Sequence, residues 1–102
     1  ANAYACLARQ GVFREATCLE QAEAGKATRL FSAEAAYLVA EMLSGGERGA
    51  AAGGPAAEVR QPRVAWKTGT SAGNRDAWCL AYNPEYVVRV WIGNTAGRAT
   101  PA

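Results

Sequence analysis

The sequence predicts an α+β fold in which two helices accompany an antiparallel three-stranded sheet. Two observations support this prediction. Apolar residues recur at helical spacing in the first half of the chain, whereas from Arg63 onward they alternate with a period of two. The links between the alternating stretches are too short for crossover connections, so neighbouring strands should run antiparallel. We therefore expect a meander of three strands with the helices against one face.

Length and composition limit what the chain can be. It has 102 residues, half of them apolar, which suits one small domain or part of a larger one. The net charge of +2 is too small to indicate a nucleic-acid partner or a membrane surface. No apolar run approaches the roughly 18 residues that a membrane helix needs. The opening stretch begins inside a helical pattern without a capping residue, so we expect a piece of a longer protein.

The cysteines do not predict a metal site. Cys6, Cys18 and Cys79 form no CxxC pair and the chain lacks histidine, so we expect neither a metal nor a cofactor. We expect all three to be small buried apolar residues. A Cys6–Cys18 disulfide remains open for an oxidising compartment.

The helices are expected over residues 1–10 and 33–44. The first has apolar residues at helical spacing and Gly11 as its C-cap, and a short hairpin or extended excursion should follow through residue 31. Ser32 is a suitable N-cap for the second helix. Its apolar stripe, which we expect to face the core, comprises Ala35, Leu38, Val39, Met42 and Leu43.

A Gly-, Ala- and Pro-rich stretch over residues 45–62 predicts a flexible surface loop. It lacks the Gly-Lys-Ser/Thr ending of a phosphate-binding loop. Strands are expected over residues 63–70, 76–82 and 86–94, joined by the turns "AGNR" and "NPE".

The segment "WKTGTS" places unusual polar residues in the first of these strands. Alternation puts Thr68 and Thr70 on one face with Trp66, and Ala65, Lys67 and Gly69 on the other. The two hydroxyls could together bind a carboxylate, with the Lys67 ammonium curling around the strand edge. Gly69 would let another backbone lie close. These features suit an extended acidic peptide that binds by strand addition.

A purely structural interpretation carries equal weight on the residues alone. Threonine favours strands, glycine can mark a bulge, and a single lysine can protect an edge. We assign Trp78 and Trp91 to packing, and Arg75 and Asp76 to surface pairing.

The order of motifs resembles a known family. "KTGTS", "RDAW" and "VVRVWIGN", preceded by "ANAYACLARQGVFREA" and "FSAEAAYLVAEML", resemble the C-terminal part of the transpeptidase domain of class A bifunctional penicillin-binding proteins, in particular the type 1C. The resemblance implies a fragment of the serine β-lactamase/transpeptidase-like fold. It also implies a peptidoglycan D,D-transpeptidase parent, anchored at the periplasmic face of the bacterial inner membrane, and we expect no anchor within this chain.

The resemblance also implies specific roles. Lys67 would support proton transfer and substrate binding, and the Thr68 and Thr70 hydroxyls would hold the carboxylate of a D-Ala-D-Ala stem peptide or of a β-lactam. Gly69 would belong to the same substrate wall, and the Thr70 backbone N–H would supply half of an oxyanion hole.

The sequence departs from the family in lacking two of its motifs. Family members use a Ser-x-x-Lys nucleophile and a Ser-x-Asn, and none of Ser32, Ser44 and Ser71 begins either. We therefore expect the chain alone to be inactive, and its last strand to self-associate through an unpaired edge. The alternatives are a non-catalytic peptide- or partner-binding module, or a degenerate relative with structural duties only.

Overall fold

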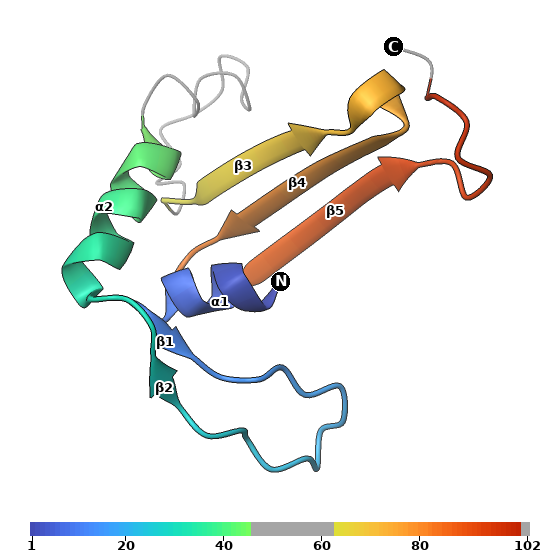
Figure 1. Ribbon diagram of the computed structural model, residues 1–102. Coiled ribbons are helices and arrows are strands. Elements are labelled where there is room, and N and C mark those ends of the chain that lie inside the picture. The colour runs from blue at the N-terminus through green and yellow to red at the C-terminus, as the bar shows by residue number, and fades with distance from the viewer. Residues whose placement is uncertain (46–62, 101–102) are drawn as a thin grey trace, which may run out of the picture.

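The computed structural model describes residues 1–45 and 63–100, which form two α-helices, a short 3₁₀ turn at Ala72–Asn74, a three-stranded antiparallel sheet and a small two-stranded ribbon (Figure 1). The α+β class and the antiparallel meander are confirmed. The helices are α1 (Asn2–Ala8) and α2 (Ala33–Ser44). The sheet contains β3 (Ala65–Thr70), β4 (Asp76–Tyr82) and β5 (Val87–Gly93), and the ribbon contains β1 (Val12–Phe13) and β2 (Thr28–Arg29).

The sheet has the order β3-β4-β5, so β4 is central. β3 begins at Ala65, two residues later than expected. Both predicted turns occur: Gly73 and Asn74 take positive φ values of 73° and 53°, and the Asn83 side chain accepts hydrogen bonds from two following backbone N–H groups. The loop predicted over residues 45–62 lies, apart from Gly45, outside the described residues.

α1 ends at Ala8, two residues before its predicted limit, in a left-handed turn. The Gln10 N–H donates to Leu7 O (3.0 Å) and the Gly11 N–H donates to Cys6 O (2.8 Å), the hydrogen-bond pattern of a Schellman motif. Gln10 and Gly11 have φ values of 54° and 90°. The turn brings Gly11 against the backbone of Phe31, and the β1–β2 ribbon forms the predicted hairpin between them.

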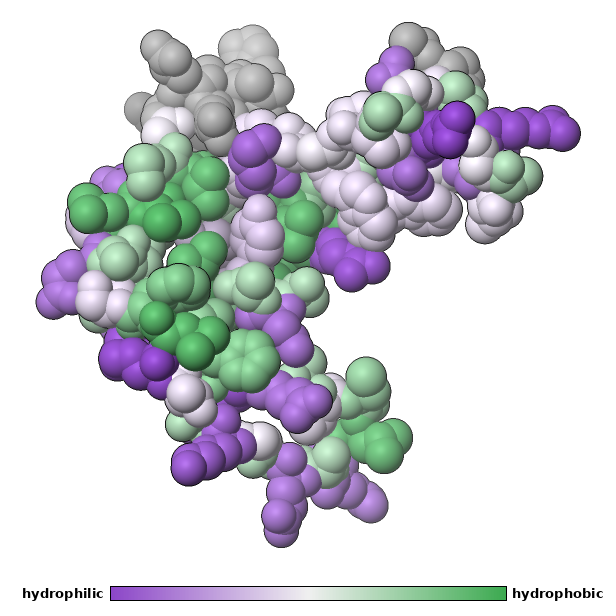
Figure 2. Space-filling model, viewed as in Figure 1, coloured by the Kyte–Doolittle hydropathy of each residue, from purple (hydrophilic) through white to green (hydrophobic). Residues whose placement is uncertain are grey.

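α2 starts as predicted but buries a different side. The Ser32 hydroxyl accepts from the Ala35 N–H at 3.1 Å, which confirms the N-cap. Ala36 is buried, whereas Ala35, Leu38 and Met42 are exposed, the last two by 59% and 68%, so the predicted stripe is wrong at these three positions. Ala36 is the buried residue of the helix, and no described residue covers Leu38 and Met42. Apolar side chains gather on the surface over α2 (Figure 2).

The buried core lies at one end of the sheet, where both helices meet it. Its fully buried hydrophobic members are few: Cys6, Ala36, Ala65 and Tyr82. The Cα radius of gyration is 16.1 Å, compared with about 13 Å for a compact domain of this length. The rest of the sheet therefore extends away from the helices. The three cysteines are free, and burial is correct for Cys6 alone. Cys79 is half-buried, and Cys18 is exposed because it lies in the long loop of the hairpin.

Replacing Gly11 with alanine should destabilise the chain by at least about 2 kcal/mol, because a left-handed conformation is strained for alanine. The added Cβ would also lie 2.2 Å from the Phe31 carbonyl oxygen. Urea unfolding of the 102-residue chain measures the effect. Gly69→Ala is the matched control, since its Cβ would meet no atom within 4 Å. Equal stabilities of the two variants would contradict this account of the turn.

Candidate functional site

The segment Lys67–Thr70 lies on a free edge of the described sheet, because β3 pairs only with β4. The Ser71 N–H donates to Asp76 O at 2.9 Å. Antiparallel pairs alternate between bonded and non-bonded positions, so Thr68 and Thr70 direct their backbone N–H and C=O groups away from β4. The Thr70 N–H, the expected oxyanion donor, is therefore directed to the open edge.

The two threonine hydroxyls lie on the same face of the sheet. The register pairs Thr68 with Cys79 and Thr70 with Ala77, both on that face. Both threonines are exposed, and within the described residues neither hydroxyl has a hydrogen-bond partner. The hydroxyls are thus accessible to a ligand at the edge.

Lys67 starts on the opposite face but reaches the same edge. Its ammonium donates a short hydrogen bond to the Thr68 carbonyl oxygen, which the ladder leaves free. This brings a positive charge beside the edge backbone, as the sequence suggested. Gly69, between the threonines, leaves open space where a side chain would be.

Asp76 and Trp91 have contacts that the sequence did not indicate. Asp76 makes no ion pair among the described residues; its carboxylate accepts from the Trp91 indole N–H (2.8 Å) and the Ser71 hydroxyl (3.2 Å). The expectation of surface pairing is therefore wrong for Asp76. Trp91 stacks on Trp78, with ring centroids 6.1 Å apart, but is itself 41% exposed. The register that opposes Asp76 and Gly93 is the signal that could have revealed this contact.

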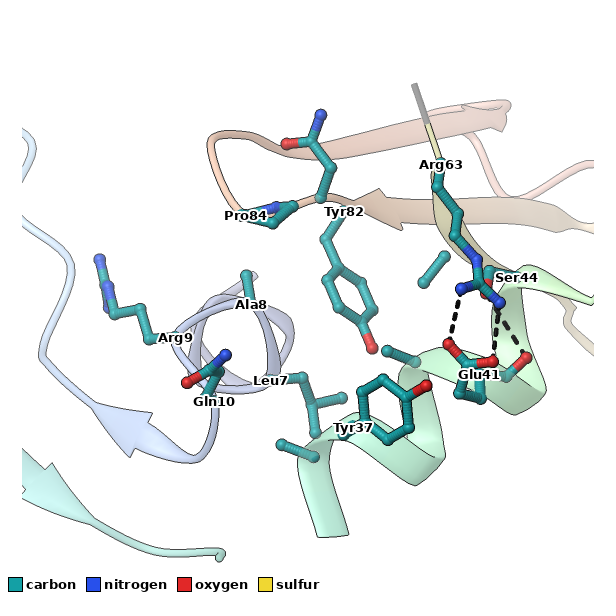
Figure 3. Close-up of a pocket in the computed structure, with 14 residues that line it drawn as sticks. Leu7, Ala8, Arg9, Gln10, Tyr37, Glu41, Ser44, Arg63, Tyr82 and Pro84 are labelled. Carbon is teal, nitrogen blue, oxygen red and sulfur yellow. Dashed lines mark hydrogen bonds and ion pairs between the residues drawn. The ribbon is translucent and has the colours of Figure 1, made fainter. Parts of the chain in front are cut away.

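A cavity lies elsewhere, between α1, α2 and the near end of the sheet (Figure 3). It has a volume of about 520 Å³, and an Arg63–Glu41 ion pair of 2.7 Å lies at its side. None of residues 67–70 lines it. In the described part of the chain, no cluster of three acidic or cysteine side chains could hold a metal ion.

Tyr82 projects between the helices beside this cavity (Figure 3). The residue is only 4% exposed, and its hydroxyl has no hydrogen-bond partner among the residues that the structure describes. Burial, and to a smaller extent the neighbouring Tyr4, raises the pKa of Tyr82 above its usual value of 10.0. Tyr82 therefore has a structural role, filling the junction at which Tyr4 meets it edge-on.

Comparison with known proteins relates the sequence to one group. A stretch of 71 residues, 67% of the chain, is 37% identical to penicillin-binding protein 1C of Escherichia coli K12. Another alignment, over 68 residues, is 37% identical to penicillin-binding protein 1A of Pseudomonas aeruginosa. The chain is similar to part of the penicillin-binding proteins. No protein-family sequence model matches it.

These penicillin-binding proteins are far longer than the chain. The two alignments each span 8% of the relative's length. A third, to penicillin-binding protein 1A/1B of Bacillus subtilis, covers 96% of this chain and 13% of that protein at 28% identity. The chain thus corresponds to a small part of the length of each of these relatives.

Tyr82→Phe should raise the free energy of unfolding by about 1 kcal/mol near pH 7, because it removes a buried hydroxyl without a partner. The difference should grow above pH 10. Because the pKa of Tyr82 is raised in the folded state, the phenol ionises first in the unfolded state. The wild-type chain is unaffected below pH 10 but loses stability as the pH rises through the raised pKa, and Tyr82→Phe lacks this loss. Urea unfolding at pH 7 and pH 10.5 tests this. Tyr86→Phe, at a 68% exposed position, is the control; a parallel alkaline loss in both variants would contradict the assignment.

Proposed function

We propose that the chain supplies one wall of the active site of a peptidoglycan D,D-transpeptidase, as the C-terminal part of the transpeptidase domain of a class A bifunctional penicillin-binding protein. The observation that carries the proposal is the free edge of β3, with two accessible hydroxyls, an ammonium and an outward backbone N–H within four residues. Similarity to proteins named penicillin-binding supports it, and a type 1C relative among them fits the subtype.

The wall would bind the acidic end of a stem peptide. The Thr68 and Thr70 hydroxyls would donate hydrogen bonds to the terminal carboxylate of D-Ala-D-Ala, with the Lys67 ammonium adding positive charge. The peptide backbone would lie along β3 and pair with its free N–H and C=O groups. Gly69 would allow this approach because it presents no side chain.

The chemistry is acyl transfer through a serine that another part of the parent provides. Its oxygen attacks the carbonyl between the two D-alanines, and the terminal D-alanine leaves with a proton delivered to its amine. The Thr70 N–H stabilises the oxyanion that forms. An acceptor amine then attacks the acyl-enzyme, which forms the cross-link and restores the serine. A β-lactam would acylate the same serine.

A non-catalytic peptide-binding module is the second candidate, and the same free edge favours it. The two candidates differ in the coding sequence upstream of this chain, where an in-frame Ser-x-x-Lys would support the enzyme.

We propose that the parent enzyme is located at the periplasmic face of the inner membrane. Among the described residues, no helix is long and apolar enough to cross a membrane.

Three substitutions in the parent protein test the wall. Lys67→Ala should slow acylation by fluorescent penicillin about 100-fold or more, as expected for loss of a group that supports proton transfer. Thr68→Val and Thr70→Val should each weaken binding about 10-fold, because each removes a hydrogen bond to a charged group. Lys26→Ala, the other lysine, is the control. Acylation unchanged in Lys67→Ala would remove Lys67 from its role.

The isolated 102-residue chain should not be labelled covalently by fluorescent penicillin, because no Ser-x-x-Lys occurs in it. Gel fluorescence after incubation measures labelling, with the parent as positive control. Stoichiometric labelling of the chain would show that it contains a nucleophile after all.

The isolated chain should also self-associate through β5. This strand is the other edge of the described sheet, and Val88, Val90 and Ile92 are 47–62% exposed on it. Unpaired apolar edges promote pairing with a second copy. Light scattering at high concentration should report a dimer or larger species, whereas a monomer would refute the expectation.

A further inference from the structure

A cluster of three side chains closes the turn that follows the proposed oxyanion donor. We define the Asp76 clasp as Ser71, Asp76 and Trp91. Ser71 and Asp76 share three hydrogen bonds: Ser71 N–H to Asp76 O (2.9 Å), Asp76 N–H to the Ser71 hydroxyl oxygen (2.9 Å), and that hydroxyl to Asp76 Oδ2 (3.2 Å). The clasp thus holds the residue directly after Thr70 through both backbone and side chain.

Trp91 connects this turn to the far strand of the sheet. Its indole N–H donates to Asp76 Oδ1 at 2.8 Å, so the carboxylate joins the end of β3 to β5 across β4. Hydrogen bonds to an ionised acceptor are stronger than neutral ones. Trp78 lies beside Trp91 at a tilt, with ring centroids 6.1 Å apart, and among the described residues it makes no hydrogen bond to Asp76.

Gly93 makes this geometry possible. Asp76 and Gly93 are directly opposite each other, and Trp91 lies two residues before Gly93 on the same face. A Cβ at position 93 would come within 2.5–2.9 Å of three indole atoms, including Nε1. The ring therefore lies across the space that a side chain would fill, and this places its N–H against Asp76.

We infer that Asp76, held by Trp91 and Ser71, is a positioning residue that fixes the orientation of the Thr70 backbone N–H in acyl transfer. The inference rests on the function proposed above. Thr70 is the last residue of β3, and one peptide later the Ser71 N–H is bonded to Asp76. A strand end is free to twist unless the following residue is held. The clasp supplies that restraint from the face opposite the threonine hydroxyls. It therefore fixes the orientation of the Thr70 N–H without contacting the substrate.

This role predicts a specific kinetic signature in the parent protein. Loss of the clasp should lower the rate constant of acylation by penicillin about 10-fold or more, which is less than the roughly 100- to 1,000-fold loss expected when an oxyanion donor is removed. The initial binding constant should stay the same, because the hydroxyls that hold the carboxylate lie on the other face. A loss of general stability would instead reduce the fraction of active enzyme.

The variants are Asp76→Ala, Trp91→Phe and Gly93→Ala, measured by stopped-flow acylation with melting temperature in parallel. Trp78→Phe is the matched control, since it shortens the other ring of the stacked pair without a bond to Asp76. Asp76→Asn should restore most of the rate, because its amide can still accept from Trp91 and donate to the Ser71 oxygen. Trp91→Phe keeps the test valid if Asp76→Ala does not fold.

The outcomes separate the two proposals. Wild-type rate constants in folded Trp91→Phe and Gly93→Ala, with wild-type enzyme that is acylated normally, would overturn the positioning role alone. Equal slowing in Trp78→Phe would overturn it also, since the effect would then be general. A wild-type parent that penicillin does not acylate would overturn the proposed function and the positioning role together.

Discussion

The hydrogen bond between the Ser71 N–H and Asp76 O determines what β3 presents at its free edge. It fixes the phase of the β3–β4 ladder, and from that phase follow both the outward backbone of Thr68 and Thr70 and the face on which their hydroxyls lie. A shift by one residue would turn the hydroxyls to the opposite face and direct the Thr70 N–H into the sheet. The features that make this edge suitable for a peptide thus depend on one pairing.

The two ends of the three-stranded sheet are stabilised by different contacts. At the Ala65–Tyr82 end, α1 and α2 cover the sheet and enclose the small buried core. At the Thr70 end no described helix covers the strands, and order there comes from cross-strand contacts: the Asp76 clasp and the stacked pair of tryptophans. The proposed substrate wall therefore depends on polar and aromatic contacts rather than on buried apolar area.

Local chemistry allowed much of the fold to be predicted from the sequence. The period-two alternation gave β4 its correct limits, Ser32 marked the start of α2, and the Gly-Asn pair marked the turn after β3. These signals depend only on neighbouring residues. The buried side of α2 could not be obtained in this way, because the helix has apolar residues on several sides, and its contacts decide which are covered.

In the candidate site, too, the features set by neighbouring residues could be predicted and those set by distant contacts could not. Alternation alone placed Thr68 and Thr70 on one face, and the register agrees. The contact of Asp76 with Trp91 joins residues fifteen positions apart on two strands, and it depends on the ring lying over Gly93. No local pattern encodes that diagonal contact, so the sequence alone predicts only surface pairing for Asp76 and packing for Trp91. Trp91 in particular has the apolar character of a packing residue and a polar function at its edge.

The placement of the Asp76 carboxylate has an electrostatic consequence. Thr70 pairs with Ala77, and Asp76, the residue before Ala77, lies on the opposite face of β4. The hydrogen-bonded backbone of the sheet therefore separates the carboxylate from the threonine hydroxyls and from the place where an acidic ligand would dock. An acidic side chain at position 77, one residue further along, would share the ligand's side of the sheet and repel it. The sheet thereby gains the structural benefit of an anion at its end while keeping the face of the threonine hydroxyls free of like charge.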